Sequence, residues 1–307
     1  MARKGRWICQ RLETVRKFIF GKELADENFL YCSELLDYGL VLEGGGLRGL
    51  YTSGVIDLFL EKGIEFPCVI GVSAGAGYGC SFVSKQYGRN LKMLREFRKD
   101  PRYLSLRSYI KTGSYFGLDF IYDEIPKHIP FDTKTFLDSP TRFITVCSNV
   151  ETGEAEYFDK DEDILQALKA SSAVPFMCKI VEYKGKKLLD GGIADAIPLK
   201  KSIELGFSKN VVVLTHPAGF RRKDGFHPSW LFYRKYPKFV KAVNSYVARY
   251  NESLDLVEKE AEKGNVILIR PSRDLKVKRT ESDVAKIERL YELGKEDAGK
   301  ISHPISI

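Results

Sequence analysis

A serine set between glycines directly follows a short apolar run of the sequence. Ser73 is the centre of Gly-Val-Ser-Ala-Gly at residues 71–75, after the apolar residues 68–70. The glycines permit a sharp turn from strand to helix that exposes the serine hydroxyl at the edge of a sheet. In such a turn the N–H of Ala74 points to where an oxyanion would form. The motif is common by chance, but its place after an apolar strand favours a nucleophile at Ser73.

A second glycine-rich sequence, Gly-Gly-Gly-Leu-Arg-Gly at residues 44–49, lies between an expected strand and an expected helix. Its amides can approach a ligand closely, and the helix N-terminus adds positive potential. Read literally, it is also the G-x-G-x-x-G fingerprint of dinucleotide binding, which requires an acidic residue at the end of the next strand. Here the next strand runs into Gly71 without an acid. A phosphate- or dinucleotide-binding module therefore remains only an alternative function.

The two glycine motifs are separated by one helix and one strand, which is the length of a single βαβ unit. Such a crossover usually places its strands side by side, with both turns at the same carboxyl edge. We therefore expect the glycine loop to lie against Ser73, as in a nucleophile with a backbone oxyanion hole. One preorganised donor of that kind lowers a reaction barrier by on the order of 3 kcal/mol.

A serine nucleophile also needs a base, and the residues alone leave two candidates. Asp190 begins Asp-Gly-Gly at residues 190–192, which by itself is an ordinary turn sequence. Among the four histidines, His216 is the one that follows a convincing strand, at 210–215. The order serine, acid, histidine suits the triad of an α/β-hydrolase, although that fold usually has more strands ahead of its nucleophile. Both a Ser73–Asp190 pair and a triad with His216 stay open.

Four sequence blocks together resemble the patatin-like phospholipases. They are the glycine motif at 44–49, G-x-S-x-G at 71–75, Ala-Ser-Ser-Ala-Val-Pro at 170–175 and Asp-Gly-Gly at 190–192. Their joint order and spacing are far more specific than any one block, and the resemblance covers about residues 38–215. It implies hydrolysis of lipid acyl esters, of the phospholipase A or lysophospholipase type, without a metal or cofactor.

The resemblance also implies roles for individual residues. Ser73 would be the nucleophile and Asp190 the base of a dyad that needs no histidine. Arg48 would hold the glycine loop or bind a phosphate of the substrate. Glu43 stands where many members of the family have Asp, which leaves the dyad unchanged. The oxyanion hole would consist of the amides of Gly44, Gly45, Gly46 and Ala74.

Apolar strands separated by amphipathic stretches predict a three-layer α/β/α fold with a mainly parallel sheet. The expected strands lie at 38–42, 68–70, 141–146, 210–215 and 265–270, and the expected helices include 47–62, 239–263 and 282–293. We divide the chain into a basic amphipathic segment at 1–34, a catalytic domain at 35–218 and an α/β extension at 219–307 that packs on it. The aromatic-rich stretch 89–140 is either a lid or an ordinary helical insertion, and the second interpretation is favoured.

Composition limits the partners and the location of the protein. The 307 residues carry a net charge of +8 and 44% hydrophobic residues, as in an ordinary globular chain with a mild basic excess. The six cysteines lack the spacing of a zinc site, which predicts reduced thiols and a cytoplasmic location. The basic amphipathic residues 1–22 either bind an anionic membrane or pack on the domain. We expect a lipid ester substrate and no nucleic-acid partner, and the oligomeric state stays open.

Overall fold

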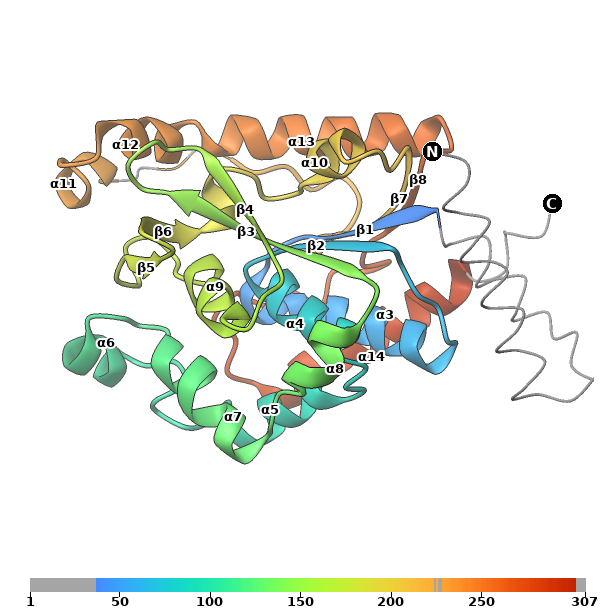
Figure 1. Ribbon diagram of the computed structural model, residues 1–307, viewed down its shortest axis with the longest axis horizontal. Coiled ribbons are helices and arrows are strands. Elements are labelled where there is room, and N and C mark those ends of the chain that lie inside the picture. Colours follow the sequence, from blue (N-terminus) through green and yellow to red (C-terminus); the bar gives the residue numbers. More distant parts are fainter. Residues whose placement is uncertain (1–36, 224, 226–227, 302–307) are drawn as a thin grey trace, which may run out of the picture.

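The structure of the protein, a computed structural model, describes residues 37–223, 225 and 228–301. The basic amphipathic segment expected at 1–34, and with it the membrane contact expected of residues 1–22, lies outside the described residues. The described chain forms a central sheet with helices on both of its faces (Figure 1). The predicted three-layer α/β/α fold class is therefore confirmed.

Within the described residues the sheet has eight strands, in the order β5-β6-β3-β2-β1-β7-β8, with β4 paired to β3 outside this path. Five of them, β3, β2, β1, β7 and β8, pair in parallel, whereas β4, β5 and β6 pair antiparallel. The strands are β1 (Tyr38–Leu42), β2 (Cys68–Val72), β3 (Arg142–Asn149), β4 (Ala155–Asp159), β5 (Val181–Tyr183), β6 (Lys186–Asp190), β7 (Lys209–Val213) and β8 (Val266–Ile269).

Helices cover the sheet because its central strands are apolar on both faces. In β1, Leu40 and Leu42 pack into the cluster that contains Tyr51 of α3, whereas Val41 packs with Tyr250 of α13 on the opposite face. Alternate residues of a strand point to opposite faces, so this one strand contributes to two cores. One layer contains α3 (Leu50–Glu61), α4 (Ala74–Val83) and α14 (Val284–Ile301), and the other contains α10 (Leu199–Glu204) and α13 (Tyr246–Glu262) (Figure 1).

The remaining helices lie around these layers. Those of the 89–140 stretch, together with α9, are on the α4 side of the sheet in Figure 1, and α11 and α12 lie at one end of the opposite layer. They are α5 (Arg89–Phe97), α6 (Leu106–Thr112), α7 (Ile125–His128), α8 (Thr133–Asp138), α9 (Ile164–Ser171), α11 (Ser229–Phe232) and α12 (Pro237–Asn244).

Several predicted elements differ from those of the structure. The antiparallel strands β4, β5 and β6 were not predicted, because their sequences mix charged and apolar residues and they are only partly buried. The helix predicted at 239–263 is two helices, α12 and α13, separated at Ser245, whose hydroxyl donates to the Lys241 carbonyl. The last helix continues to Ile301 rather than ending at 293. The helix predicted from residue 47 begins as a short 3₁₀ turn, and α3 follows at Leu50.

The unequal lengths of β2 and β3 position the acidic residue of the site. Residues 142–146 of β3 pair with β2, and the strand then continues to Asn149. Its projecting end pairs antiparallel with β6, in which Asp190 lies opposite Cys147. The end of β6 therefore reaches the same edge of the sheet at which β2 ends and Ser73 begins.

Candidate active site

Ser73 occupies a strained turn between β2 and α4. Its backbone angles are φ 53° and ψ −124°, a conformation that residues with a side chain rarely adopt. Such strain costs of order 1–3 kcal/mol and persists only where the surroundings hold it. Here the Ser73 N–H donates to Ser171 Oγ at 2.8 Å, and the Ser171 hydroxyl donates to the Val146 carbonyl at 2.6 Å. The last residue of α9 thus fixes the serine turn to β3 at Val146, where the pairing of β3 with β2 ends.

Close backbone contacts explain the glycines on both sides of Ser73. A Cβ atom on Gly75 would lie 2.6 Å from the carbonyl oxygens of Leu42 and Glu43. A Cβ atom on Gly71 would lie 2.5 Å from the Cα atom of Ala76. Both distances are too short for any side chain. Glycine at position 75 therefore lets the turn approach the end of β1, and glycine at position 71 lets β2 lie close to the first turn of α4.

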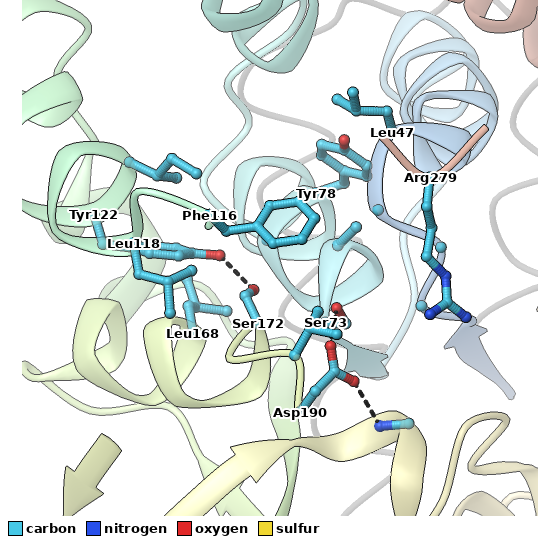
Figure 2. A pocket seen from close by; sticks show the side chains of 18 of the residues that line it. Leu47, Ser73, Tyr78, Phe116, Leu118, Tyr122, Leu168, Ser172, Asp190 and Arg279 are labelled. Carbon is cyan, nitrogen blue, oxygen red and sulfur yellow. Dashed lines mark hydrogen bonds between the residues drawn. The ribbon is translucent and has the colours of Figure 1, made fainter. Parts of the chain in front are cut away.

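Asp190 lies directly against the serine hydroxyl. Ser73 Oγ donates to Asp190 Oδ2 at 2.6 Å, and the Gly192 N–H donates to Asp190 Oδ1 at 2.8 Å (Figure 2). The backbone of Asp190 is also held, since its N–H donates to the Ala173 carbonyl at 2.9 Å and its carbonyl accepts from Ser148 Oγ at 2.7 Å. Both carboxylate oxygens therefore have donors, and the Asp-Gly-Gly turn orients one of them at Ser73.

The surroundings of Asp190 raise the pKa of its carboxyl group above the ordinary value. Burial is the largest cause, because it disfavours the charged form. The hydrogen bonds from Ser73 and Gly192 and the positive charges of Arg279 and Arg222 act in the opposite direction and offset part of the increase. Burial thus makes Asp190 a better proton acceptor than an exposed aspartate.

The glycine loop after β1 lies against Ser73, as the βαβ spacing predicted. A Cβ atom on Gly44 would lie 3.0 Å from the Cβ of Ser73. The loop and the residue after Ser73 line the cavity, and their N–H groups have no hydrogen-bond acceptor within the described residues, whereas the neighbouring Leu47 N–H donates to the Arg279 carbonyl at 3.1 Å. The residues with these free amides are Gly44, Gly45, Gly46 and Ala74.

Glu43, the residue before this loop, fixes the start of the loop to Thr215 and to Tyr250 of α13. Glu43 Oε2 accepts from the N–H of Thr215 at 2.6 Å and from its hydroxyl at 3.0 Å, and Oε1 accepts from the Tyr250 hydroxyl at 2.7 Å. The side chain is fully buried, yet three donors satisfy it. No role was predicted for Glu43, although a charged residue at the end of an apolar strand was an available signal.

The role expected of Arg48, to hold the glycine loop or bind a phosphate, stays a prediction, and Arg48 is not among the described residues that line the cavity. It is half-buried, its Nε has no hydrogen-bond partner among the described residues, and burial lowers its pKa to about 10. Three arginines do line the cavity: Arg89, and also Arg222 and Arg279, which lie more than 170 residues further along the chain than Arg48. No local motif of the sequence pointed to them.

His216 is not part of a triad with Ser73 and Asp190 in this structure. Its ring stacks on Phe220 with centroids 3.5 Å apart, and its Nε2 is buried with no partner among the described residues. Burial, with the positive charges of nearby arginines, lowers the pKa of His216 to about 3. The position of His216 therefore gives no support to the alternative triad, whereas Ser73 donates directly to the carboxylate of Asp190.

A cavity of about 240 Å³ opens at Ser73 and Asp190. Its volume is just below the usual range for small-molecule sites of about 300–1,000 Å³. Figure 2 shows Arg279 on the opposite side of Ser73 from Tyr122 and Leu118. The cavity lining is mainly apolar and includes Tyr78, Met93, Tyr103, Phe116, Leu118, Ile121, Tyr122, Leu165, Leu168 and Phe176.

Three parts of the chain build this cavity. The stretch 89–140 supplies much of the apolar wall, so it encloses the site in addition to packing its aromatics inward. Residues 219–307 supply Arg222, Val243, Tyr246 and Arg279. Within the described residues, no group of His, Cys, Asp and Glu could hold a metal ion, and no helix is long and apolar enough to cross a membrane.

Comparisons with known proteins bear on this site. Residues 40–202 match the family model of patatin-like phospholipases, and residues 236–305 match a domain of unknown function, DUF6363. The uncharacterized protein YjjU of Escherichia coli is 26% identical over 269 residues, which cover 83% of this chain and 74% of YjjU.

Two further relatives are much longer proteins. The lysophospholipase NTE1 of Candida glabrata is 24% identical over 311 residues, which cover 90% of this chain and 17% of NTE1. NTE1 of Saccharomyces cerevisiae is 25% identical over 292 residues, which cover 86% of this chain and 16% of that NTE1. The chain thus spans less than a fifth of the length of these two relatives.

Among solved structures, VipD from Legionella pneumophila matches with a TM-score of 0.42 at 15% identity, covering 86% of this chain and 66% of VipD. The family match is the informative comparison, since it contains Ser73, Asp190 and the glycine loop and extends over more than half of the 307 residues. By this match the chain belongs to the patatin-like phospholipase family.

Proposed function

We propose that the protein hydrolyses acyl esters of lipids, with Ser73 as nucleophile and Asp190 as its base. The observation that carries the proposal is the 2.6 Å hydrogen bond from Ser73 Oγ to Asp190 Oδ2 at the mouth of an apolar cavity. Membership of the patatin-like phospholipase family supports a lipid ester as the substrate. A phosphate- or dinucleotide-binding module would have no use for this serine–carboxylate contact.

In the first half of the reaction Ser73 Oγ attacks the ester carbonyl carbon while its proton passes to Asp190 Oδ2. The negative charge on the carbonyl oxygen is stabilised by the free amides of the glycine loop and of Ala74. When the tetrahedral intermediate collapses, the C–O bond to the alcohol breaks and Asp190 returns the proton to the leaving oxygen. The acyl group is then an ester of Ser73.

In the second half a water molecule takes the position of the alcohol. Asp190 accepts a proton from this water, whose oxygen attacks the acyl carbon, and the same amides stabilise the second oxyanion. The bond to Ser73 Oγ breaks, and Asp190 returns the proton to the serine. The products are a free fatty acid and the regenerated Ser73 hydroxyl.

The cavity favours a lipid with one acyl chain and an anionic head group. Its apolar wall and its volume of about 240 Å³ suit a single chain. Arg222 and Arg279 line the cavity together with the dyad, and Asp190 is the one carboxylate among the described residues that line it. Phosphate is a good ligand for guanidinium groups. A lysophospholipid fits this arrangement, in agreement with the names of the NTE1 relatives.

Labelling with a fluorophosphonate tests the nucleophile, because this reagent reacts with activated serines. We expect labelling of the wild type and complete loss of labelling in Ser73→Ala. Ser172→Ala is the matched control, since Ser172 lines the same cavity but its hydroxyl pairs with Tyr122 at 2.7 Å. An unlabelled wild type, or labelled Ser73→Ala, would refute the proposal.

Release of fatty acid from a lysophospholipid tests the base. Asp190→Asn removes the proton acceptor of Ser73, so kcat should fall by about three orders of magnitude or more. The amide oxygen of asparagine can still accept from Gly192, so the fold should survive. His216→Ala should retain most of the activity. Full activity in Asp190→Asn, or none in folded His216→Ala, would contradict the dyad.

A further inference from the structure

Exposed apolar side chains concentrate on two short helices. Of the eight large apolar side chains exposed in the described residues, six lie on α6 and α11, and three of these six are more than 60% exposed. A soluble protein rarely presents so dense a group of apolar side chains unless it contacts a partner there. The six are Leu106, Tyr109 and Ile110 on α6, and Trp230, Leu231 and Phe232 on α11.

Both helices border the same wall of the cavity. The Phe232 ring packs edge-on against Phe176 with centroids 5.4 Å apart, and the Phe176 N–H donates to the Tyr233 hydroxyl at 3.0 Å. On the other side, the Tyr115 N–H, three residues after α6, donates to the Met177 carbonyl at 2.6 Å. Phe176 itself lines the cavity. Figure 1 shows α6 and α11 at the same end of the molecule.

The two segments that contain these helices carry basic side chains and no acidic ones, although Arg102 pairs with Asp100 just before the first segment. Residues 101–118 and 225–251 contain no Asp or Glu, yet they hold three and five Lys or Arg residues respectively. Exposed basic side chains stand next to the apolar ones, among them Arg107 beside Leu106 and Arg234 after α11. Apolar side chains with a basic rim suit the surface of an anionic bilayer, where aromatic and aliphatic groups insert and cations meet head groups.

We propose that α6 and α11 form a docking face that inserts into an anionic lipid bilayer and brings the cavity to its substrate. The face is Leu106, Tyr109, Ile110, Trp230, Leu231 and Phe232. This inference rests on the proposed function, because it describes how a lipid reaches the same site. It differs from a membrane contact of residues 1–22, which would leave these six side chains in water.

The fluorescence of Trp230 tests insertion directly. The chain has two tryptophans, so Trp7→Phe leaves Trp230 as the single emitter. Adding phosphatidylglycerol vesicles should shift its emission to shorter wavelength, and brominated lipids should quench it. Pure phosphatidylcholine vesicles should give a weaker response, and salt should weaken the response to phosphatidylglycerol. Unchanged Trp230 emission with phosphatidylglycerol vesicles would overturn the proposal, even if the protein sediments with them.

Substitution of the face tests its contribution to binding. The fourfold variant Leu106→Gln, Ile110→Gln, Trp230→Gln, Leu231→Gln should bind phosphatidylglycerol vesicles at least about tenfold more weakly, since even one large inserted side chain contributes about that factor. Ile203→Gln is the matched control, because Ile203 is exposed but lies on α10. Vesicle binding is measured in the Ser73→Ala background, so that hydrolysis does not alter the lipid.

Hydrolysis of a soluble short-chain ester separates this proposal from the proposed function. The fourfold variant, with Ser73 intact, should hydrolyse that ester at the wild-type rate, because none of its four residues lines the cavity. Wild-type vesicle binding by the variant would refute the docking face. So would a wild type that forms dimers, binds no vesicles and becomes monomeric in the variant, because the face would then join two copies of the chain. Loss of ester hydrolysis in the wild type would instead refute the proposed function.

Discussion

The reactivity proposed for Ser73 depends on how the carboxyl group of Asp190 is surrounded. Burial raises the pKa of Asp190, while Arg279 and Arg222 lower it again. A general base works best when its pKa is near the working pH but low enough for the group to stay ionised. At the scale of single residues, the arginines thus have two proposed tasks, since they attract an anionic head group and also keep the base deprotonated.

The activity of the enzyme should therefore depend on pH through Asp190. The base must be ionised, so kcat/KM should fall as the pH drops through its raised pKa, and this acidic limb should lie above the ordinary aspartate value of 3.8. Arg279→Gln removes a positive charge and should raise that pKa further, so the limb moves to higher pH. A soluble neutral ester is the substrate for this measurement, because its binding needs no head-group contact.

Two control variants make the pH prediction specific. Arg289→Gln removes the same charge from an exposed position on α14 and should leave the limb in place. His216→Asn should also leave it in place, since a histidine whose pKa is about 3 stays neutral over the working range. A limb that disappears in His216→Asn would assign the titration to the imidazole. A limb that moves to lower pH in Arg279→Gln would contradict the electrostatic role of Arg279.

At the scale of elements, the site consists of the ends of strands, and the end of α9 secures one of them. The Ser171 hydroxyl accepts a hydrogen bond from the N–H of Ser73 and donates one to the carbonyl of Val146. It is fully buried, so neither partner can turn to water if the hydroxyl is removed. The serine turn is strained, and this hydrogen bond is one of the contacts that hold it.

Ser171→Ala should both destabilise the protein and slow its reaction. It leaves a buried donor and a buried acceptor unpaired, which should lower the free energy of unfolding by about 1–3 kcal/mol. The relaxed turn should also lower kcat more than it raises KM, because Ser73 rather than the lipid is displaced. Urea denaturation and steady-state kinetics measure the two effects. Ser172→Ala, one residue away and only partly buried, is the control, and an equal loss of stability there would show that the loss is not specific to Ser171.

The sequence predicted those elements whose signal is local. The strands at 38–42 and 68–70 were predicted because each is a short apolar run followed by a glycine turn, and both are present as β1 and β2. Asp190 was named from its motif, but its approach to Ser73 depends on the projecting end of β3 and on the antiparallel strand β6. Those features arise from pairing between distant segments, for which one sequence has no local pattern. Arg222 and Arg279 were not predicted for the same reason, because they reach the cavity from segments far from Ser73 in the sequence.

At the scale of the whole molecule, residues 219–301 are built into the same fold as Ser73 and Asp190, as far as the structure describes them. β8 is a strand of the central sheet, and α14 packs closely along α3. Two buried hydrogen bonds join these helices, from Tyr51 to Asp297 at 3.2 Å and from Tyr291 to Asp57 at 2.9 Å. The segment between β8 and α14 also reaches the glycine loop through the carbonyl of Arg279. We therefore propose that the extension is an integral part of the catalytic unit.

A glycine on α14 permits this close packing and gives a sharp test. A Cβ atom on Gly294 would lie 2.1 Å from the carbonyl oxygen of Tyr51, which is backbone and has little room to move. Gly294→Ala should therefore force the helices apart and lower the free energy of unfolding by about 1–3 kcal/mol. Because the segment that precedes α14 touches the glycine loop, kcat should fall as well.

Gly299→Ala on the same helix should have the opposite effect on stability. The Cβ atom of this variant would meet its nearest neighbour, Leu58 Cδ2, at 3.8 Å, an ordinary contact distance. Alanine is a better helix former than glycine by about 0.8–1.0 kcal/mol, so this variant should be as stable as the wild type or more stable.

Thermal or urea denaturation measures the stability of both variants, and kinetics with a soluble ester shows whether the glycine loop has moved. If Gly294→Ala behaves like Gly299→Ala, α14 is not held tightly on α3. If Gly294→Ala is destabilised but keeps its full kcat in the fraction that remains folded, the extension stabilises the fold without shaping the site.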